Sequence, residues 1–180
     1  MPSNTTVLLV RHAEKPEAGP GLAVAGQERA QAYIAYFQNY MISGTPARYN
    51  YLFATADSHE SCRPRLTIEP LAGALGLSIN SNYADKSYGD LAKEILDHSK
   101  YNNSIILICW HHGEILNLAE ALGVSPQTLP ASSSWPVPPW PEDVYGWLLQ
   151  ISYAENGTII PAQTFCINEQ LMYNDAKLVA

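Results

Sequence analysis

The chain has 180 residues, of which 47% are hydrophobic and 15% are charged, and its net charge is −7. This composition is typical of a folded chain with a substantial core and excludes an intrinsically disordered one. The acidic balance argues against broad binding of nucleic acid or anionic membranes, since both need a basic surface. We therefore expect one domain over residues 1–180, in which a few local arginines must hold any bound anion.

The cysteines and the N-terminus bear on the cellular compartment. Cys62, Cys109 and Cys166 are odd in number and widely spaced, so they indicate neither a disulfide framework nor a C-x-x-C metal pattern. The N-terminal residues lack the basic stretch, apolar core and cleavage site of a secretory signal. No apolar run approaches the roughly 20 residues that span a bilayer. We expect a cytoplasmic protein without membrane contact.

The first half of the chain predicts two strands and two helices. Residues 6–10 form a continuous apolar run, typical of a strand buried on both faces. A loop rich in Pro and Gly follows, and residues 26–42 carry apolar side chains at helical spacing. Residues 51–54 predict the second strand, and residues 63–75 predict the second helix.

The second half continues the alternation. A short strand, a helix, a strong strand and another helix are expected at residues 77–79, 88–98, 104–110 and 111–123. Residues 132–143, SSSWPVPPWPED, contain too many prolines for regular structure and are long enough to be a functional loop. Residues 144–153 and 158–167 predict a hairpin around Asn156-Gly157. Alternating strands and helices indicate an α/β fold with a mostly parallel sheet.

Unusual side chains follow three of the predicted strands. The first strand leads to Arg11-His12, the second to Arg63 and Arg65, and the strong strand to His111-His112. Ligands of open parallel sheets bind beyond the carboxyl ends of the strands. If these strands are neighbours, histidines and arginines converge on one edge of the sheet. Successive strand side chains point to opposite faces, so at most one of the two adjacent histidines faces this site. At least one of the two later arginines is expected to be solvated.

Such a set of side chains suits phosphoryl transfer. A neutral imidazole can attack phosphorus to form a phosphohistidine, and guanidinium groups can bind the phosphate oxygens. This scheme needs no metal and no cofactor. The sequence contains no G-x-x-x-x-G-K-[ST] loop, G-x-S-x-G elbow or H-E-x-x-H motif, and no cysteine precedes an arginine by six positions. A zinc site built from His12, His112 and an acid finds no support in the spacing.

Three motifs in order resemble the histidine phosphatase superfamily, also called phosphoglycerate mutase-like. The first, LLVRHAEKP, is similar to its R-H-G/A signature. The second, RPRLTIEPLA, resembles an arginine followed four residues later by a threonine at a helix start. The third, ILICWHHGEI, resembles a strand that ends in a histidine and then a glycine. The resemblance covers most of residues 5–125 and implies a three-layer α/β/α sandwich with a mostly parallel central sheet.

The resemblance also implies roles for individual residues. His12 would be the nucleophile, with Arg11 and Arg63 binding the phosphoryl oxygens. His112, directly before Gly113, would be the second histidine, so that His111 would point elsewhere. The general acid that protonates the leaving oxygen would be Asp85, with Asp90, Glu114 or no dedicated acid as alternatives.

The resemblance further implies a phosphatase, a phosphoric monoester hydrolase that forms a phosphohistidine. No large insertion caps the site, and an open site favours hydrolysis over phosphoryl retention. The substrate would be a phosphorylated small molecule or a phosphoprotein, and residues 135–141 are expected to form one wall of the site. The alternatives are a phosphomutase and a non-catalytic module that binds phosphate or phosphoprotein.

Overall fold

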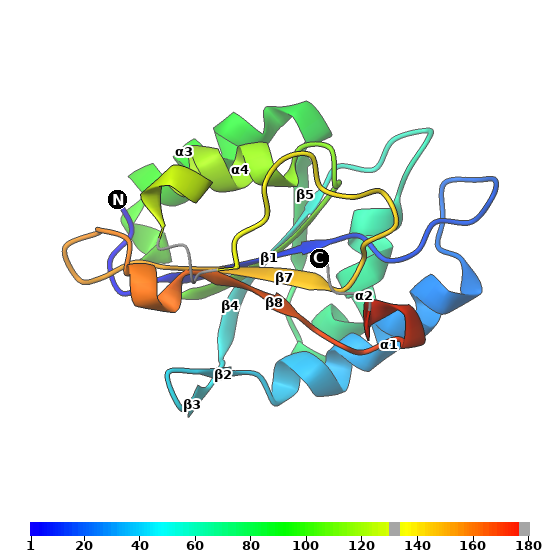
Figure 1. Ribbon diagram of the computed structural model, residues 1–180, viewed down its shortest axis with the longest axis horizontal. Coiled ribbons are helices and arrows are strands. Elements are labelled where there is room, and N and C mark those ends of the chain that lie inside the picture. Colours follow the sequence, from blue (N-terminus) through cyan, green and yellow to red (C-terminus); the bar gives the residue numbers. More distant parts are fainter. Residues whose placement is uncertain (130–133, 177–180) are drawn as a thin grey trace.

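A computed structural model describes residues 1–129 and 134–176 of the chain, so Ser132 and Ser133 of the predicted proline-rich loop lie outside the described residues. At its centre is a six-stranded sheet with the strand order β5-β4-β6-β1-β7-β8 (Figure 1). Its strands are β1 (Thr6–Arg11), β4 (Tyr49–Thr55), β5 (Ile79–Tyr83), β6 (Ile105–Trp110), β7 (Trp147–Ser152) and β8 (Phe165–Asn168). Strands β5, β4, β6 and β1 run parallel, and β7 is antiparallel to both β1 and β8.

Four α-helices cover the two faces of this sheet. Helices α1 (Val24–Gln38) and α2 (Arg63–Leu75) lie on one face, and α3 (Tyr88–Asp97) and α4 (Ile115–Ala121) lie on the other (Figure 1). Short 3₁₀ helices are η1 (Asp85–Ser87), η2 (Ser99–Tyr101), η3 (Pro126–Thr128), η5 (Pro161–Gln163) and η6 (Tyr173–Ala176). The arrangement confirms the predicted three-layer α/β/α sandwich with a mostly parallel sheet.

The alternation of side chains along the central strands divides the core into two parts. In β1, Leu8 and Val10 pack on the side of α1 and α2, whereas Val7 and Leu9 pack on the side of α3 and α4. Strand β6 alternates in the same way and is buried along most of its length. Both strands were predicted from continuous apolar runs, and burial on both faces is the reason for those runs.

Several boundaries differ from the sequence-based prediction. Helix α1 ends at Gln38 rather than at residue 42, because β2 (Met41–Ile42) pairs with β3 (Thr45–Pro46) across a turn with two positive φ angles. Strand β5 begins at Ile79, because Leu77 still closes α2 by donating its N–H to the Ala72 carbonyl. Helix α4 begins at Ile115, later than predicted.

The predicted hairpin has its turn at Asn156-Gly157, but its strands do not pair continuously from that turn. Tyr153 and Ile159 form an isolated bridge, and η5 then separates the bridge from the β7–β8 ladder. That ladder starts at Gln150 opposite Phe165 and ends at Trp147 opposite Asn168. Among the described residues, no helix has the length and apolar character needed to cross a bilayer.

Candidate active site

The carboxyl ends of β1 and β6 bring two histidines into contact. These strands are parallel neighbours, and Arg11 lies opposite Trp110 in their register. His12 extends the ladder by donating its backbone N–H to the Trp110 carbonyl at 3.0 Å. The next residue of β6 is His111, whose ring centroid lies 5.0 Å from that of His12 at an interplanar angle of 68°. Two imidazoles therefore meet at the edge of the sheet.

The prediction that His111 points away from the site is wrong. Its position continues the side of β6 that carries Leu107 and Cys109, just as His12 continues the side of β1 that carries Val10. His112 continues the opposite side and lines a groove at the start of α4. The structure therefore brings His111, which was not among the predicted site residues, against His12. The predicted Arg11 and Arg63 act on the pKa of His12, whereas the predicted His112 lines the groove instead. Aligning the two apolar strand sequences with each other would have paired His12 with His111.

The His12 ring has a defined tautomer. Its Nδ1 lies 2.7 Å from the Ala13 carbonyl oxygen, which can only accept a hydrogen bond, so Nδ1 carries the proton. Nε2 is then left with a free lone pair. Burial lowers the pKa of His12 to about 2, and Arg11, Arg63 and His111 act in the same direction, whereas the bond to Ala13 opposes them. The ring is neutral at physiological pH, as a nucleophile must be.

Arg11 is fully buried and holds the loop that precedes β7. Its Nη1 donates to the carbonyl oxygens of Pro141, Glu142 and Val144 at 3.1, 2.8 and 2.8 Å. Its Cζ lies 3.9 Å from the centroid of the Tyr145 ring, and its Nε is buried without a hydrogen-bond partner among the described residues. One edge of the guanidinium is thus used by the protein, while Nε stays unpaired.

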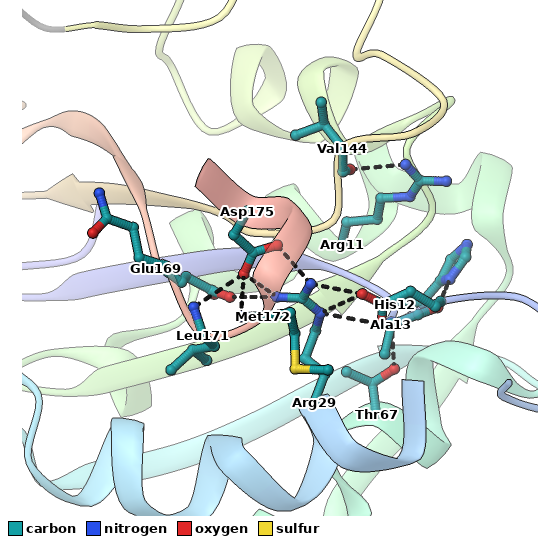
Figure 2. Close-up of polar contacts among 12 residues, drawn as sticks. Arg11, His12, Ala13, Arg29, Thr67, Val144, Glu169, Leu171, Met172 and Asp175 are labelled. Atoms are coloured by element: carbon teal, nitrogen blue, oxygen red, sulfur yellow. Dashed lines mark hydrogen bonds and ion pairs between the residues drawn. The ribbon is translucent and has the colours of Figure 1, made fainter. Parts of the chain in front are cut away.

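Arg63 begins α2 and reaches the same edge of the sheet. Its Nη1 donates to the carbonyl oxygens of Gly19 and Glu60, both at 3.3 Å, and within the part of the chain that the structure describes its buried Nε has no partner. Thr67, four residues later, accepts the Ala13 N–H and donates to the Arg63 carbonyl, both at 2.8 Å (Figure 2). The two hydrogen bonds of Thr67 therefore attach the first turn of α2 to Ala13, the residue after His12.

Arg65, the alternative to Arg63, is engaged on the surface. Its Nε lies 2.9 Å from Asp57 and its Nη1 lies 2.8 Å from Glu69. These ion pairs hold its guanidinium among carboxylates, where an added phosphate would be repelled. Arg63, in contrast, lowers the pKa of both His12 and His111 through its charge, which indicates that it is close to both rings.

The electrostatic character of this site favours an anion. Burial lowers the pKa of His111 to about 4, with further lowering by Arg63, His112 and Arg11. Both imidazoles are therefore neutral at physiological pH, while both guanidinium groups are charged. Glu14, Glu142 and Asp143 act on Arg11 from its surroundings, while the two rings add no negative charge. A bound phosphate would offset the guanidinium charge and use the unpaired Nε atoms.

A partly buried carboxyl lies near the same edge of the sheet. Asp85 follows β5 in η1, and its backbone carbonyl accepts a hydrogen bond from Trp110 Nε1 at 3.1 Å. Burial raises the pKa of Asp85 to about 6, with a further rise caused by Glu114. Its Oδ1 is shielded and has no partner among the described residues. Of the three carboxyls considered from the sequence, Asp85 has the raised pKa expected of a general acid, and Asp90 is exposed.

Two further features were missed by sequence reasoning. Tyr145 packs between the site residues, with its ring centroid 6.2 Å from His12 and its face against Arg11. Nothing in the sequence distinguishes this tyrosine, because its place depends on the path of the loop before β7. That residues 135–141 form one wall of the site stays a prediction; among the bonds that Arg11 donates to the loop, one reaches the Pro141 carbonyl.

The second feature is a buried ionic cluster behind the site. Arg29 of α1 lies 2.7 Å from Asp175 and 3.5 Å from Glu169 (Figure 2). Arg29 also lies 2.7 Å from Glu14, and Tyr33 donates to Glu169. Glu14 comes two residues after His12, so this cluster ties the loop after β1 to α1 and to the C-terminal segment. Within residues 1–129 and 134–176, no three His, Cys, Asp or Glu side chains are grouped so as to hold a metal ion.

No protein-family profile matches the sequence, and the comparison with curated proteins finds no match. Solved structures do resemble the fold. The protein histidine phosphatase SixA complexed with tungstate aligns with 91% of this chain and 97% of its own, at a TM-score of 0.55 and 12% identity. Phosphoglycerate mutase from Plasmodium falciparum aligns with 88% of each chain, at a TM-score of 0.53 and 13% identity. A putative phosphohistidine phosphatase SixA from Agrobacterium tumefaciens covers 87% of this chain and 96% of its own, at a TM-score of 0.51 and 20% identity. The chain therefore has the phosphoglycerate mutase-like fold.

Proposed function

We propose that this protein is a phosphatase that hydrolyses phosphomonoesters through a phosphohistidine on His12. The observation that carries the proposal is the pairing of a neutral, Nδ1-protonated His12 with the ring of His111 at 5.0 Å, beside two arginines with unpaired Nε atoms. This set combines a nucleophile with donors for a phosphoryl group. Solved proteins of the same fold include phosphatases, and one of them was solved with tungstate, a tetrahedral oxyanion like phosphate.

In the first step, the Nε2 lone pair of His12 attacks phosphorus and the ester P–O bond breaks. Arg11 and Arg63 bind the phosphoryl oxygens, and the protonated Asp85 gives its proton to the leaving oxygen. His111, and not His112, hydrogen-bonds the phosphoryl group beside His12. In the second step, the ionised Asp85 takes a proton from water as the water oxygen attacks phosphorus. The P–N bond breaks, inorganic phosphate leaves, His12 regains its neutral form and Asp85 is protonated again.

The first test measures turnover of several phosphoesters by the wild type, His12→Ala and the control His98→Ala. His98 lies exposed after the end of α3, so its removal should leave activity unchanged. We expect His12→Ala to lose activity by at least about 10³-fold, because the covalent route is lost. Rapid quenching of the wild type should trap an acid-labile phosphoenzyme, and tungstate should inhibit competitively. Phosphate relocated on the substrate rather than released to water would instead establish a phosphomutase.

The second test compares His111→Ala with His112→Ala. We expect the loss of His111 to lower kcat by about 10²–10³-fold, because one donor to the transferring group disappears. The loss of His112 should change kcat much less, because this ring lies on the other side of β6. Equal losses would contradict the assignment. If the wild type binds phosphate but turns over no phosphoester, the protein is a binding module instead.

A further inference from the structure

A groove next to this site has a chemical character of its own. It lies between the start of α4 and the proline-rich loop, with a volume of about 360 Å³. His112 and Leu116 line one side, and Pro138, Pro139 and Trp140 line the other. Such a volume admits an aromatic ring or a group of similar size, and the lining is mostly apolar.

Two chain segments link the groove to the phosphate site. The carbonyls of Pro141 and Glu142, two residues of its wall, accept the hydrogen bonds of Arg11 Nη1. On the opposite wall, His112 directly follows His111, whose ring contacts His12. A phosphoester held by Arg11 at His12 would therefore lie beside the wall that Pro141 and Glu142 share with this groove.

The charges along the groove are one-sided. Glu142 is the one acidic side chain among the described residues that line the groove, and these include no lysine or arginine. Burial lowers the pKa of His112, and the charges of Arg11 and Lys15, which lie outside the lining, lower it further. A carboxylate or second phosphate on the leaving group would meet no cation within this lining and would be repelled by Glu142. An uncharged group meets no such penalty, and an ammonium group is attracted.

We propose that this groove binds the leaving group of the phosphoester and selects an apolar group that is uncharged or cationic. The inference rests on the proposed phosphatase function, because it places the phosphoryl group at His12. The substrate class is therefore an aryl or similarly apolar phosphomonoester, and not a phosphorylated carboxylic acid or a bisphosphate.

The experiment compares three ligands of one shape: benzylphosphonate and its 4-carboxy and 4-aminomethyl derivatives. Their P–C bond is not hydrolysed, so calorimetry measures affinity even if turnover is absent. We expect the wild type to bind the 4-carboxy compound at least about tenfold more weakly than the parent, and the 4-aminomethyl compound at least as tightly as the parent. Glu142→Arg should reverse this order. Glu155→Arg, the same charge reversal in the turn at the far end of β7, should keep the wild-type order.

The outcomes separate the inference from the function on which it rests. If phosphoesters are hydrolysed through His12 but the three phosphonates bind equally, or Glu142→Arg leaves their order unchanged, the groove is not the leaving-group site. Tighter binding of the 4-carboxy compound by the wild type would also overturn the inference. Failure of every phosphonate to compete with inorganic phosphate would remove the phosphate site itself, and with it both proposals.

Discussion

Individual side chains in this site owe their chemistry to what surrounds them. The same imidazole that titrates near neutrality in water is held neutral in His12 and His111 by burial beside two guanidinium groups. Burial has the opposite effect on the Asp85 carboxyl, whose pKa rises to about 6. A neutral base and a protonated acid can therefore coexist at one edge of the sheet, which a nucleophile and a proton donor require.

The pKa of Asp85 predicts a pH dependence. Only the protonated carboxyl can give a proton to the leaving oxygen, so kcat/KM for an alkyl phosphate should fall as pH rises above about 6. Asp85→Asn should lower kcat for the alkyl phosphate by about 10²–10³-fold and remove this fall. For 4-nitrophenyl phosphate, whose leaving group needs no proton, the variant should change kcat little. Asp90→Asn, at an exposed position, serves as the control. Equal losses on both substrates would contradict the role of Asp85.

At the scale of elements, the position of the loop after β1, residues 12–23, depends on the close approach of α1. A Cβ on Gly26 would lie 2.5 Å from the Glu14 carbonyl oxygen and 3.0 Å from the Glu14 nitrogen. Both atoms are backbone, so they can yield only if the whole loop after β1 moves. Helix α2 holds the same loop from another direction, through Thr67 and the Ala13 N–H. The loop that orients His12 is therefore fixed by two helices.

Gly26→Ala tests this approach, with Gly73→Ala as its control. Gly73 is a helical glycine in α2 around which a Cβ would meet nothing within 4 Å. Alanine should stabilise the protein at Gly73 by up to about 1 kcal/mol, because alanine is the better helix former. At Gly26 we expect a loss of about 1–3 kcal/mol in the free energy of unfolding, because of the overlap with the backbone. Chemical denaturation measures both. Stabilisation at Gly26 would show that the loop moves freely.

At the scale of the whole molecule, one buried cation joins three distant segments. Arg29 of α1 lies between Glu14 after β1, Glu169 after β8, and Asp175 in η6 (Figure 2). Glu14 and Asp175 make the short contacts with Arg29, and Glu169 makes the longest one. Burial then raises the pKa of Glu169 to about 8, although Arg29 and the Tyr33 hydroxyl act against the rise. The Glu169 carboxyl therefore keeps its proton in the folded protein up to about pH 8.

This proton links stability to pH. The pKa of Glu169 is higher in the folded than in the unfolded chain, so its contribution is complete below the unfolded pKa and is lost as pH rises through about 8. Glu169→Gln keeps a neutral polar group and removes the titration. We expect the wild type to lose about 1.4 kcal/mol per pH unit relative to this variant between about pH 5 and pH 8. Denaturant unfolding at several pH values measures the difference. A constant difference would mean that Glu169 is ionised throughout.

Local patterns in the sequence were sufficient to predict much of the fold and of the chemistry. The apolar runs of β1 and β6 reveal their burial on two faces, and the helical spacing of residues 63–75 coincides with α2. The imidazoles and guanidinium groups of the candidate site were identified from the residues that follow the predicted strands. These features were predictable because strand and helix periodicity, and the ends of elements, are properties of neighbouring residues.

Tertiary structure decided which of these residues meet. Whether His111 or His112 faces His12 depends on the register between β1 and β6, which belongs to the pairing of two strands far apart in the chain and to neither strand alone. The attachment of the proline-rich loop to Arg11 and of Asp175 to Arg29 joins residues 130 to 146 positions apart. The pKa values depend on burial, which only the assembled layers produce. The sequence by itself therefore determined the reactive groups, while packing over long separations decided their partners and protonation.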